Sequence, residues 1–197
     1  LVTTSDGQPI PTDIEKQAYD AIATKPGRTT SRTQLQSDIN AIYSTGYFGN
    51  VKGDLQDTEI GVKVTFVVEV NPVLKSVQTE GATVLEAGTI DKIFGAQYGK
   101  VTNLRDLQAG VKELEKYYQD KGYVLAQVAD VKPQPDGTVT IIVAEGVVED
   151  IKVGFLNEEG KAQNADGTPV RGNTRDFIVT RELSLKPGAV FNRNTVQ

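Results

Sequence analysis

The sequence predicts an α+β fold built from tandem repeats, each with the order strand, helix, helix, strand, strand. The segment Ala41–Val51 ends a helix, turns at Gly46 and opens a strand, and Leu114–Val128 repeats this order with Gly122 in the place of Gly46. The two glycines are 122 − 46 = 76 residues apart, a spacing typical of repeated structural units. Around them, apolar residues at three- and four-residue spacing predict helices, and strictly alternating apolar residues predict strands.

The helices of the first repeat are marked by two expected capping boxes. Thr12 is followed three residues later by Glu15, and Ser31 is followed by Gln34, so each pair can satisfy free backbone N–H groups at a helix start. Lys25-Pro26-Gly27 is expected to end the first of these helices. Each helix therefore has a start and a stop signal in the sequence.

The strands of the first repeat form an expected hairpin, Tyr47–Leu55 followed by Val62–Val70. In the second strand, valines and a phenylalanine alternate with polar or mixed residues, which predicts a sheet covered on one face only. Because a parallel opening strand joins such a sheet through a helical crossover, both helices are expected on that one face. The opening strand itself is either reduced to Leu1–Thr4 or missing.

The second repeat is expected to contain the same elements in the same order. A short strand ends at Gly81, a short helix follows, and Asn103 stands where Ser31 stood as the cap of a longer helix. The closing hairpin turns at Pro135-Asp136-Gly137. Its expected strands are Tyr123–Val131 and Thr138–Ala144.

A third repeat begins after Gly146, because Lys186-Pro187-Gly188 repeats Lys25-Pro26-Gly27. Its opening strand is expected at Asp150–Leu156. The sequence thus predicts domains at 1–72, 73–146 and 147–197, the last stopping at the start of its second helix. Asn71-Pro72 and Glu145-Gly146 are expected to be short linkers.

The composition excludes several classes of site. The 197 residues include no cysteine and no histidine, which excludes thiol and imidazole catalysis and the common zinc sites. The net charge of −5 argues against a nucleic-acid partner. We therefore expect no catalytic residue, no bound metal and no cofactor, and because methionine is also absent, Leu1 is not expected to be a translation start.

The repeat resembles the POTRA (polypeptide-transport-associated) domain. The resemblance is carried by the GYF and GY motifs after the second helices, the valines Val51 and Val128, the strands VTFVVEV and TVTIIVAEG, and the short strand ending at Gly81. It is similar in particular to the cyanobacterial and plastid branch of the BamA-type outer-membrane assembly proteins. The resemblance implies a periplasmic, non-enzymatic arm that precedes a membrane β-barrel absent from this sequence. The implied partners are unfolded outer-membrane protein precursors, that barrel and accessory assembly subunits.

The resemblance also implies a site, because the POTRA fold places the strand after the GY motif at the edge of its sheet. An edge strand can accept an extended peptide through its free backbone groups. The expected peptide-binding residues are Phe48, Val51, Lys52, Gly53, Asp54 and Leu55 in the first repeat, and Val124, Leu125, Ala126, Gln127 and Val128 in the second. Gly46, Tyr47, Gly122, Tyr123 and Gly81 are expected to be structural, with the tyrosines in packing roles.

The role of the charged edge residues and the function of the chain both leave alternatives open. Charged and proline residues near the two edges, which are Lys52, Asp54, Asp57, Lys132, Pro133 and Pro135, are either protection against self-association or ordinary solvated residues. The chain is alternatively the arm of a two-partner secretion transporter with one dedicated client. A third reading is a structural spacer or docking arm without client contact.

Overall fold

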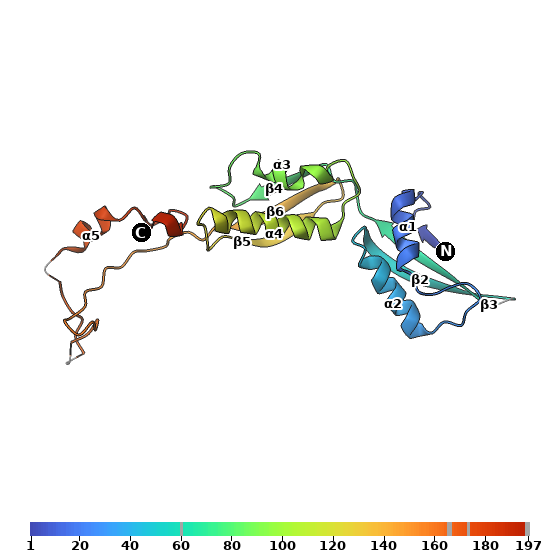
Figure 1. Cartoon of the computed structure of the whole chain (residues 1–197), viewed down its shortest axis with the longest axis horizontal. Coiled ribbons are helices and arrows are strands. Elements are labelled where there is room, and N and C mark those ends of the chain that lie inside the picture. The colour runs from blue at the N-terminus through green and yellow to red at the C-terminus, as the bar shows by residue number, and fades with distance from the viewer. Residues whose placement is uncertain (60, 165–166, 173, 196–197) are drawn as a thin grey trace. The chain divides into compact units, whose positions relative to one another are not determined.

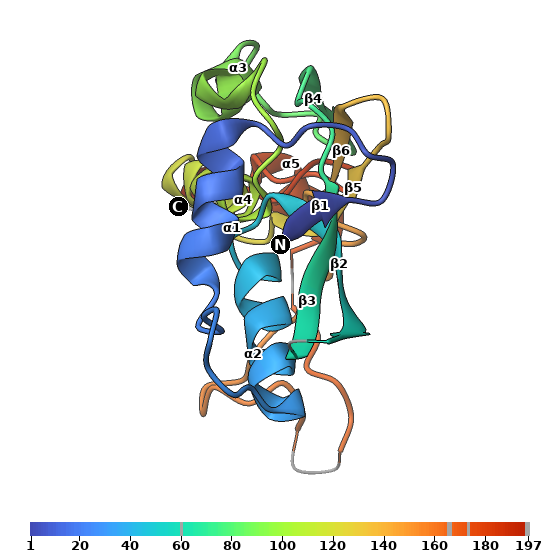
Figure 2. The same ribbon diagram turned by 90° about the vertical axis from the view of Figure 1, so that its right-hand side faces the viewer.

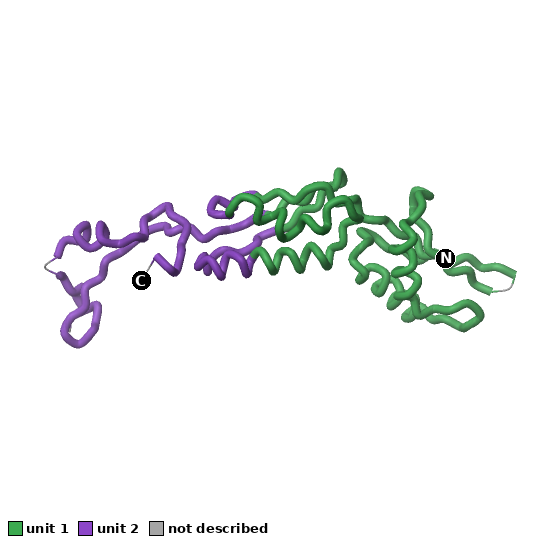
Figure 3. The backbone as a smooth tube through the Cα atoms, turned by 45° about the horizontal axis from the view of Figure 1, so that its top comes forward, with its two compact units in different colours: residues 1–79, 86–114, 131–141 green, residues 80–85, 115–130, 142–197 purple. Residues whose placement is uncertain are grey.

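The computed structural model describes residues 1–59, 61–164, 167–172 and 174–195. Contacts divide the chain into two compact units, which Figure 3 colours separately. One comprises residues 1–79, 86–114 and 131–141, and the other residues 80–85, 115–130 and 142–197. These units do not coincide with the repeat boundaries, so the division at residues 72 and 146 stays a prediction.

The first sheet has the order β1-β3-β2, with β3 in the centre (Figure 1). Strand β1 (Val2–Thr4) pairs in parallel with β3 (Gly61–Val70), and β2 (Phe48–Thr58) pairs with β3 in antiparallel fashion. The opening strand is therefore present but only three residues long. Helices α1 (Thr12–Ala21) and α2 (Arg32–Tyr43) lie side by side on one face of this sheet (Figure 2).

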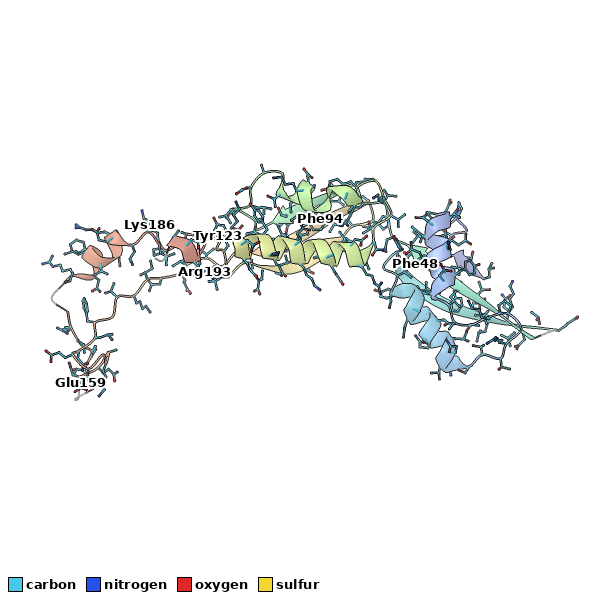
Figure 4. The ribbon with its side chains drawn as sticks, viewed as in Figure 1. Phe48, Phe94, Tyr123, Glu159, Lys186 and Arg193 are labelled. Carbon is cyan, nitrogen blue, oxygen red and sulfur yellow. The ribbon has the colours of Figure 1, made fainter. Side chains whose placement is uncertain are left out.

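The core of this half lies between the two helices and the sheet. The alternating residues Phe66 and Val68 of β3 are 2% and 1% exposed, and Phe48 of β2 is fully buried. Figure 4 labels Phe48 in this position. The other fully packed members come from both helices and the remaining strands: Val2, Ile14, Ala18, Ile22, Ile42 and Val51. Apolar periodicity thus places the core where the sequence predicts it.

The two expected capping boxes have different outcomes. Ser31 is the N-cap of α2, and its hydroxyl accepts a hydrogen bond from the Gln34 backbone N–H at 3.1 Å, which confirms the cap, whereas the Gln34 side-chain amide donates to Asp38. The prediction for Thr12 is wrong. Pro11 is the N-cap, with ψ of 133°, and its carbonyl accepts from Glu15 N at 2.9 Å, so Thr12 is already helical. A residue inside the first turn cannot cap that turn with its own side chain.

The second sheet has the order β4-β6-β5. Its elements are β4 (Ser76–Glu80), α3 (Thr89–Phe94), the 3₁₀ helix η1 (Gly95–Gln97), α4 (Leu104–Asp120), β5 (Gln127–Pro133) and β6 (Thr138–Ala144). Asn103 caps α4, because its Oδ1 accepts from Arg105 N at 2.8 Å. The α+β repeat architecture predicted from the sequence is confirmed.

The start of β5 corrects the expected strand Tyr123–Val131. Val124 and Leu125 form a turn, closed by a hydrogen bond from Ala126 N to Tyr123 O at 3.0 Å, and the strand begins only at Gln127. Gly146 packs directly against Leu125. Leu125 thus lies against the chain just past the end of β6, and it is not part of β5.

The third repeat has one short α-helix, α5 (Asp176–Glu182), and a 3₁₀ helix, η2 (Arg193–Thr195), within the described residues. The strand expected at Asp150–Leu156 is not formed. In the first sheet, the opening strand pairs with the last strand of a hairpin, and the described residues between 150 and 195 form no strand that could pair in this way. A strand without a partner strand has no ladder to stabilise it.

Within the expected linker Glu145-Gly146, Glu145 is buried and only 5% exposed. Within the described part of the chain, no helix combines the length and apolar character needed to cross a membrane.

Candidate functional site: the sheet edges

Strand β2 is an edge strand of the first sheet, and at eleven residues it is much longer than β1 at the other edge. Only Phe48 and Val51 of β2 are buried, and every later residue of the strand is exposed. It includes all six residues expected from the sequence to bind peptide in the first repeat, from Phe48 to Leu55. The structure therefore brings this part of the expected site together on one continuous strand.

The register of the sheet identifies which β2 residues direct their backbone groups outward. Phe66 N donates to Leu1 O, and Ser5 N donates to Val68 O, so the even-numbered residues of β3 face β1. Because backbone groups alternate along a strand, the odd-numbered residues of β3 face β2. Their partners, which include Lys52 opposite Val67, use their hydrogen-bonding groups inside the sheet. The N–H and C=O groups of the intervening residues, Val51, Gly53, Leu55 and Asp57, point to the free edge.

The opposite edge of the first sheet is covered. Strand β1 has three residues, and the outward N–H of Val2 donates to the Tyr19 hydroxyl of α1 at 3.1 Å. Val2 itself is 4% exposed. A peptide therefore finds a short, protected edge at β1 and a long, accessible edge at β2.

The edge strand of the second sheet is more restricted. Of the five residues expected to bind peptide there, Val124, Leu125 and Ala126 precede the strand, and only Gln127 and Val128 belong to β5. The backbone N–H of Val128 donates to Glu115 Oε1 of α4 at 3.2 Å. A side chain from the neighbouring helix thus occupies a donor that an added strand would need.

Replacing Glu115 by alanine is expected to free the Val128 N–H. Because one net hydrogen bond contributes about 1 kcal/mol, exchange of this amide with deuterium should become about fivefold faster. Hydrogen exchange followed by NMR measures it directly. Glu113→Ala, on the exposed face of the same helix, is the matched control, and an unchanged rate in Glu115→Ala contradicts the assignment.

The three glycines expected to be structural are required both by their backbone conformation and by close contacts with neighbouring atoms. Gly46 and Gly122 have φ of 89° and 91°, and a Cβ at either position would clash with an asparagine side chain, Asn103 and Asn192 respectively. A Cβ at Gly81 would clash with the Val143 carbonyl. These glycines therefore serve close contacts as well as turns.

The two tyrosines that follow the glycines pack as expected. Tyr47 is half-buried against the core of the first sheet. The ring of Tyr123 meets that of Tyr118 edge-on, with centroids 6.2 Å apart.

Two buried carboxylates were not predicted from the sequence. Asp38 of α2 is 1% exposed and accepts from Ala23 N, Thr24 N and Gln34 Nε2 at 2.9–3.0 Å. Burial raises the pKa of this carboxyl, but the hydrogen bonds that it accepts lower the pKa by more than burial raises it. The pKa of Asp38 therefore lies below its usual value. Through these hydrogen bonds, Asp38 of α2 holds the backbone of Ala23 and Thr24, which follow α1, in place.

Glu145 has the corresponding role after β6. It accepts from Thr83 N at 2.8 Å, from Val84 N at 3.0 Å, from the Thr83 hydroxyl and from the Tyr118 hydroxyl at 2.9 Å. Burial raises the pKa of this carboxyl, but these donors lower it more. Desolvation and the adjacent Glu145 carboxylate raise the pKa of Tyr118. No apolar or charge pattern in the sequence distinguishes Glu145 from a solvated glutamate.

Two family models match the chain. Residues 73–146 match the model described as "POTRA domain, ShlB-type", and residues 14–71 match "Surface antigen variable number repeat". The first range contains all three strands of the second sheet, and the second range contains β2 and β3 of the first.

Solved and curated proteins agree with these matches. The chain is 54% identical to the structure of POTRA1-3 of the periplasmic domain of Omp85 from Anabaena, with a TM-score of 0.85, covering 100% of this chain and 79% of that one. It is 29% identical to Outer envelope protein 80, chloroplastic, of Arabidopsis thaliana, over 98% of this chain and 26% of the relative. It is 25% identical to Outer membrane protein assembly factor BamA of Neisseria meningitidis, over 88% of this chain and 20% of the relative. The chain thus spans about a quarter of the length of these curated relatives.

The repeated α+β sheets, the family models and the full-length likeness to a solved POTRA region lead to the same assignment. The resemblance found in the sequence is confirmed. The chain belongs to the Omp85/BamA family of outer-membrane proteins, a non-enzymatic family, and corresponds to its periplasmic POTRA region.

Proposed function

We propose that this POTRA region receives unfolded outer-membrane protein precursors by strand addition and passes them to the membrane β-barrel of the same protein. The proposal extends to this chain the assembly role named for the Neisseria relative. Accessory assembly subunits are further proposed partners. The proposed organisation is three POTRA domains at 1–72, 73–146 and 147–197, the last one partial.

The observation that carries the proposal is the open β2 edge. Its outward groups, at Val51, Gly53, Leu55 and Asp57, lie on a strand whose exposed residues leave room for a neighbour. A backbone ladder needs no particular side chain in the client, which suits many different precursors. The lysine and aspartates along this strand would limit pairing with a second copy of the same edge.

The energetics favour weak, reversible binding. In antiparallel addition, alternate residues form two hydrogen bonds each, or about one bond per peptide residue. Each bond contributes about 0.5–1.5 kcal/mol net, whereas ordering a residue costs about 1–2 kcal/mol. The two contributions nearly cancel, so one edge holds a client loosely and releases it readily. Successive edges in one chain would increase the overall affinity through avidity.

An NMR titration with peptides from outer-membrane barrel strands tests the proposal. Amide shifts are expected to be larger for Val51, Gly53 and Leu55 than for Lys52 and Asp54, whose N–H groups already bond to β3. Scrambled peptides of the same composition keep their backbone groups and are expected to shift the same amides, whereas peptides with proline at alternate positions are expected to give smaller shifts. Shifts confined to loops, with β2 amides unchanged, would contradict the proposal and favour the spacer or docking-arm function.

A proline at position 55 is expected to reduce peptide binding at least fivefold. Leu55→Pro removes an outward N–H and places a ring on the free edge, without removing a hydrogen bond inside the sheet. Leu55→Ala is the matched control, because it shortens the 53% exposed side chain and retains the N–H. Equal affinity of the two variants, measured in the same titration, would exclude backbone pairing at this position.

A second candidate function is the arm of a two-partner secretion transporter, favoured by the ShlB-type model that matches residues 73–146. Such an arm serves one dedicated client. Binding of peptides from many unrelated barrel proteins therefore supports the assembly function, and binding restricted to one client supports the alternative.

A further inference from the structure

The residues that follow α2 accept two hydrogen bonds from the beginning of α4 and a third from Asn71. Asn103 Nδ2 donates to Thr45 O at 3.1 Å, and Leu104 N donates to Gly46 O at 2.9 Å. Asn71 Nδ2 also donates to Gly46 O, at 3.0 Å. The cap residue of α4 is thus bonded to Thr45, and the next residue, Leu104, is bonded to the helix-ending glycine of the first repeat.

The same arrangement recurs at the end of α4. Asn192 Nδ2 donates to Lys121 O at 3.0 Å, and Arg193 N donates to Gly122 O at 2.9 Å. Asn192 Oδ1 also accepts from Asn194 N at 2.9 Å, as a cap would. In Figure 4, Arg193 lies next to Tyr123, the residue after this glycine.

The backbone that leads into each asparagine is repeated as well. Thr102 N donates to Pro72 O, and Phe191 N donates to Gly146 O, at 3.0 and 2.9 Å. Each is accompanied by an isolated antiparallel bridge, Val73 with Val101 and Val147 with Val190. The segments that precede Asn103 and Asn192 differ in sequence, but they form the same set of backbone contacts.

The repeat places these asparagines at the cap of the second helix. Asn103 and Asn192 follow Ser31 by 103 − 31 = 72 and 192 − 31 = 161 residues. A serine is sufficient for capping, as the hydrogen bond from Gln34 N to Ser31 Oγ shows. An asparagine adds a second group, an amide N–H₂, that can donate to a neighbouring carbonyl while its oxygen caps the helix.

We propose that this asparagine and the glycine before the GY tyrosine form a clasp that couples each POTRA repeat to the next. The asparagine of the following repeat caps its own helix and donates to the carbonyl of the residue before the glycine, and the backbone N–H of the residue after the asparagine donates to the glycine carbonyl. Position 31 carries the cap alone, and positions 103 and 192 carry cap and clasp together. The specificity lies in the side-chain amide, because a capping Asp has no donor, and in a capping Ser one hydroxyl oxygen must both accept and donate.

The absence of a Cβ is a physical requirement of the clasp. At both glycines a Cβ would overlap the asparagine side chain, so the carbonyls are reachable only with glycine present. Each glycine also has a positive φ, which turns the chain at the helix end. Glycine thus meets both requirements: it adopts the positive φ at the helix end, and it leaves space for the asparagine side chain.

Asn103→Asp separates the two roles of the residue. The carboxylate still accepts from Arg105 N and Asp106 N, so α4 keeps its cap, but the donor to Thr45 O is lost and two oxygens then face each other. Because the chain has no cysteine, spin labels can be attached at Lys16→Cys and Lys112→Cys, both exposed. We expect the narrow label-to-label distance distribution of the parent chain to broaden in Asn103→Asp. The Leu104 amide should also exchange about five- to tenfold faster.

Ser31→Asp is the matched control, because it makes the same acidic cap without a clasp, and it is expected to leave the distribution narrow. Asn192→Asp at the second clasp repeats the test through the exchange rate of the Arg193 amide. Its effect is expected to be smaller, since Asn194 Nδ2 also reaches Lys121 O at 3.4 Å. An unchanged distribution and an unchanged Leu104 rate in Asn103→Asp would overturn the proposal. A label-to-label distance distribution in the parent chain as broad as that in Asn103→Asp would also overturn the proposal.

Discussion

Replacing Phe48 by alanine is expected to destabilise the first sheet by about 3–5 kcal/mol. The side chain is fully buried between the helices and the sheet, so truncation removes apolar contacts on both sides and leaves a cavity. Hydrogen exchange at the Ile42 and Val68 amides measures the free energy of opening in this half. Both residues are buried in the same core.

Phe48→Leu is the control for this result, because it retains most of the apolar volume and is expected to cost about 1–1.5 kcal/mol. Tyr43→Ala, on the exposed side of α2, should change stability by less than about 0.5 kcal/mol. An effect of Phe48→Ala as small as that of Tyr43→Ala would show that the core is not built around this ring. Phe48 would then become available as a peptide-binding side chain.

Replacing Glu145 by alanine is expected to cost about 3 kcal/mol of stability in the second half of the chain. The substitution leaves Thr83 N, Val84 N and the Tyr118 hydroxyl without their acceptor, and each buried donor left unpaired costs about 1–3 kcal/mol. Water that enters the vacated space would satisfy part of this loss, which keeps the total near the lower end of the sum. Exchange of the Val143 amide, next to this network in β6, reports the change.

Two variants control for the loss of a carboxylate as such. Glu145→Gln keeps one acceptor oxygen of the same reach and is expected to cost about half as much. Glu149→Ala removes an exposed carboxylate four residues later and is expected to have no measurable effect. If Glu145→Ala and Glu149→Ala behaved alike, the buried network would not contribute to stability.

The same carboxylates make stability depend on pH in a defined direction. The folded pKa values of Asp38 and Glu145 lie below their usual values of 3.8 and 4.5. Their contribution is therefore fully present above about pH 4.5 and decreases as the pH falls through the folded pKa values. In Glu145→Gln, the free energy of unfolding is expected to decrease less as the pH falls below about 4.5, because position 145 no longer titrates.

Much of the fold could be predicted from the sequence because it depends on local patterns. Alternation in Val62–Val70 places Phe66 and Val68 in the core, and Gly46 ends a helix because its positive φ favours glycine. Ser31 caps α2 because its side chain reaches the N–H of a residue three positions away. The repeat of the GY motif fixes the order of elements twice, and with it the family.

The remaining features depend on contacts between residues distant in sequence. Val124–Ala126 has a strand-like composition, but Gly146 packs against Leu125 and the strand begins at Gln127. Asp150–Leu156 has strand-forming residues without a partner strand, so the pattern has no ladder to join. Pro11 rather than Thr12 caps α1 because the chain enters the helix one residue earlier than the spacing suggests.

The sequence by itself determined the repeat, the core positions and the family, because periodicity and turn residues act within a few positions of one another. Only the tertiary structure decided which groups meet across long separations. Glu145 is buried because Thr83, 62 residues away in sequence, donates to it, and Asn103 is a clasp because Thr45, 58 residues away, accepts from it. A polar side chain has the same sequence signature whether it is solvated or paired, and only the fold supplies its partner.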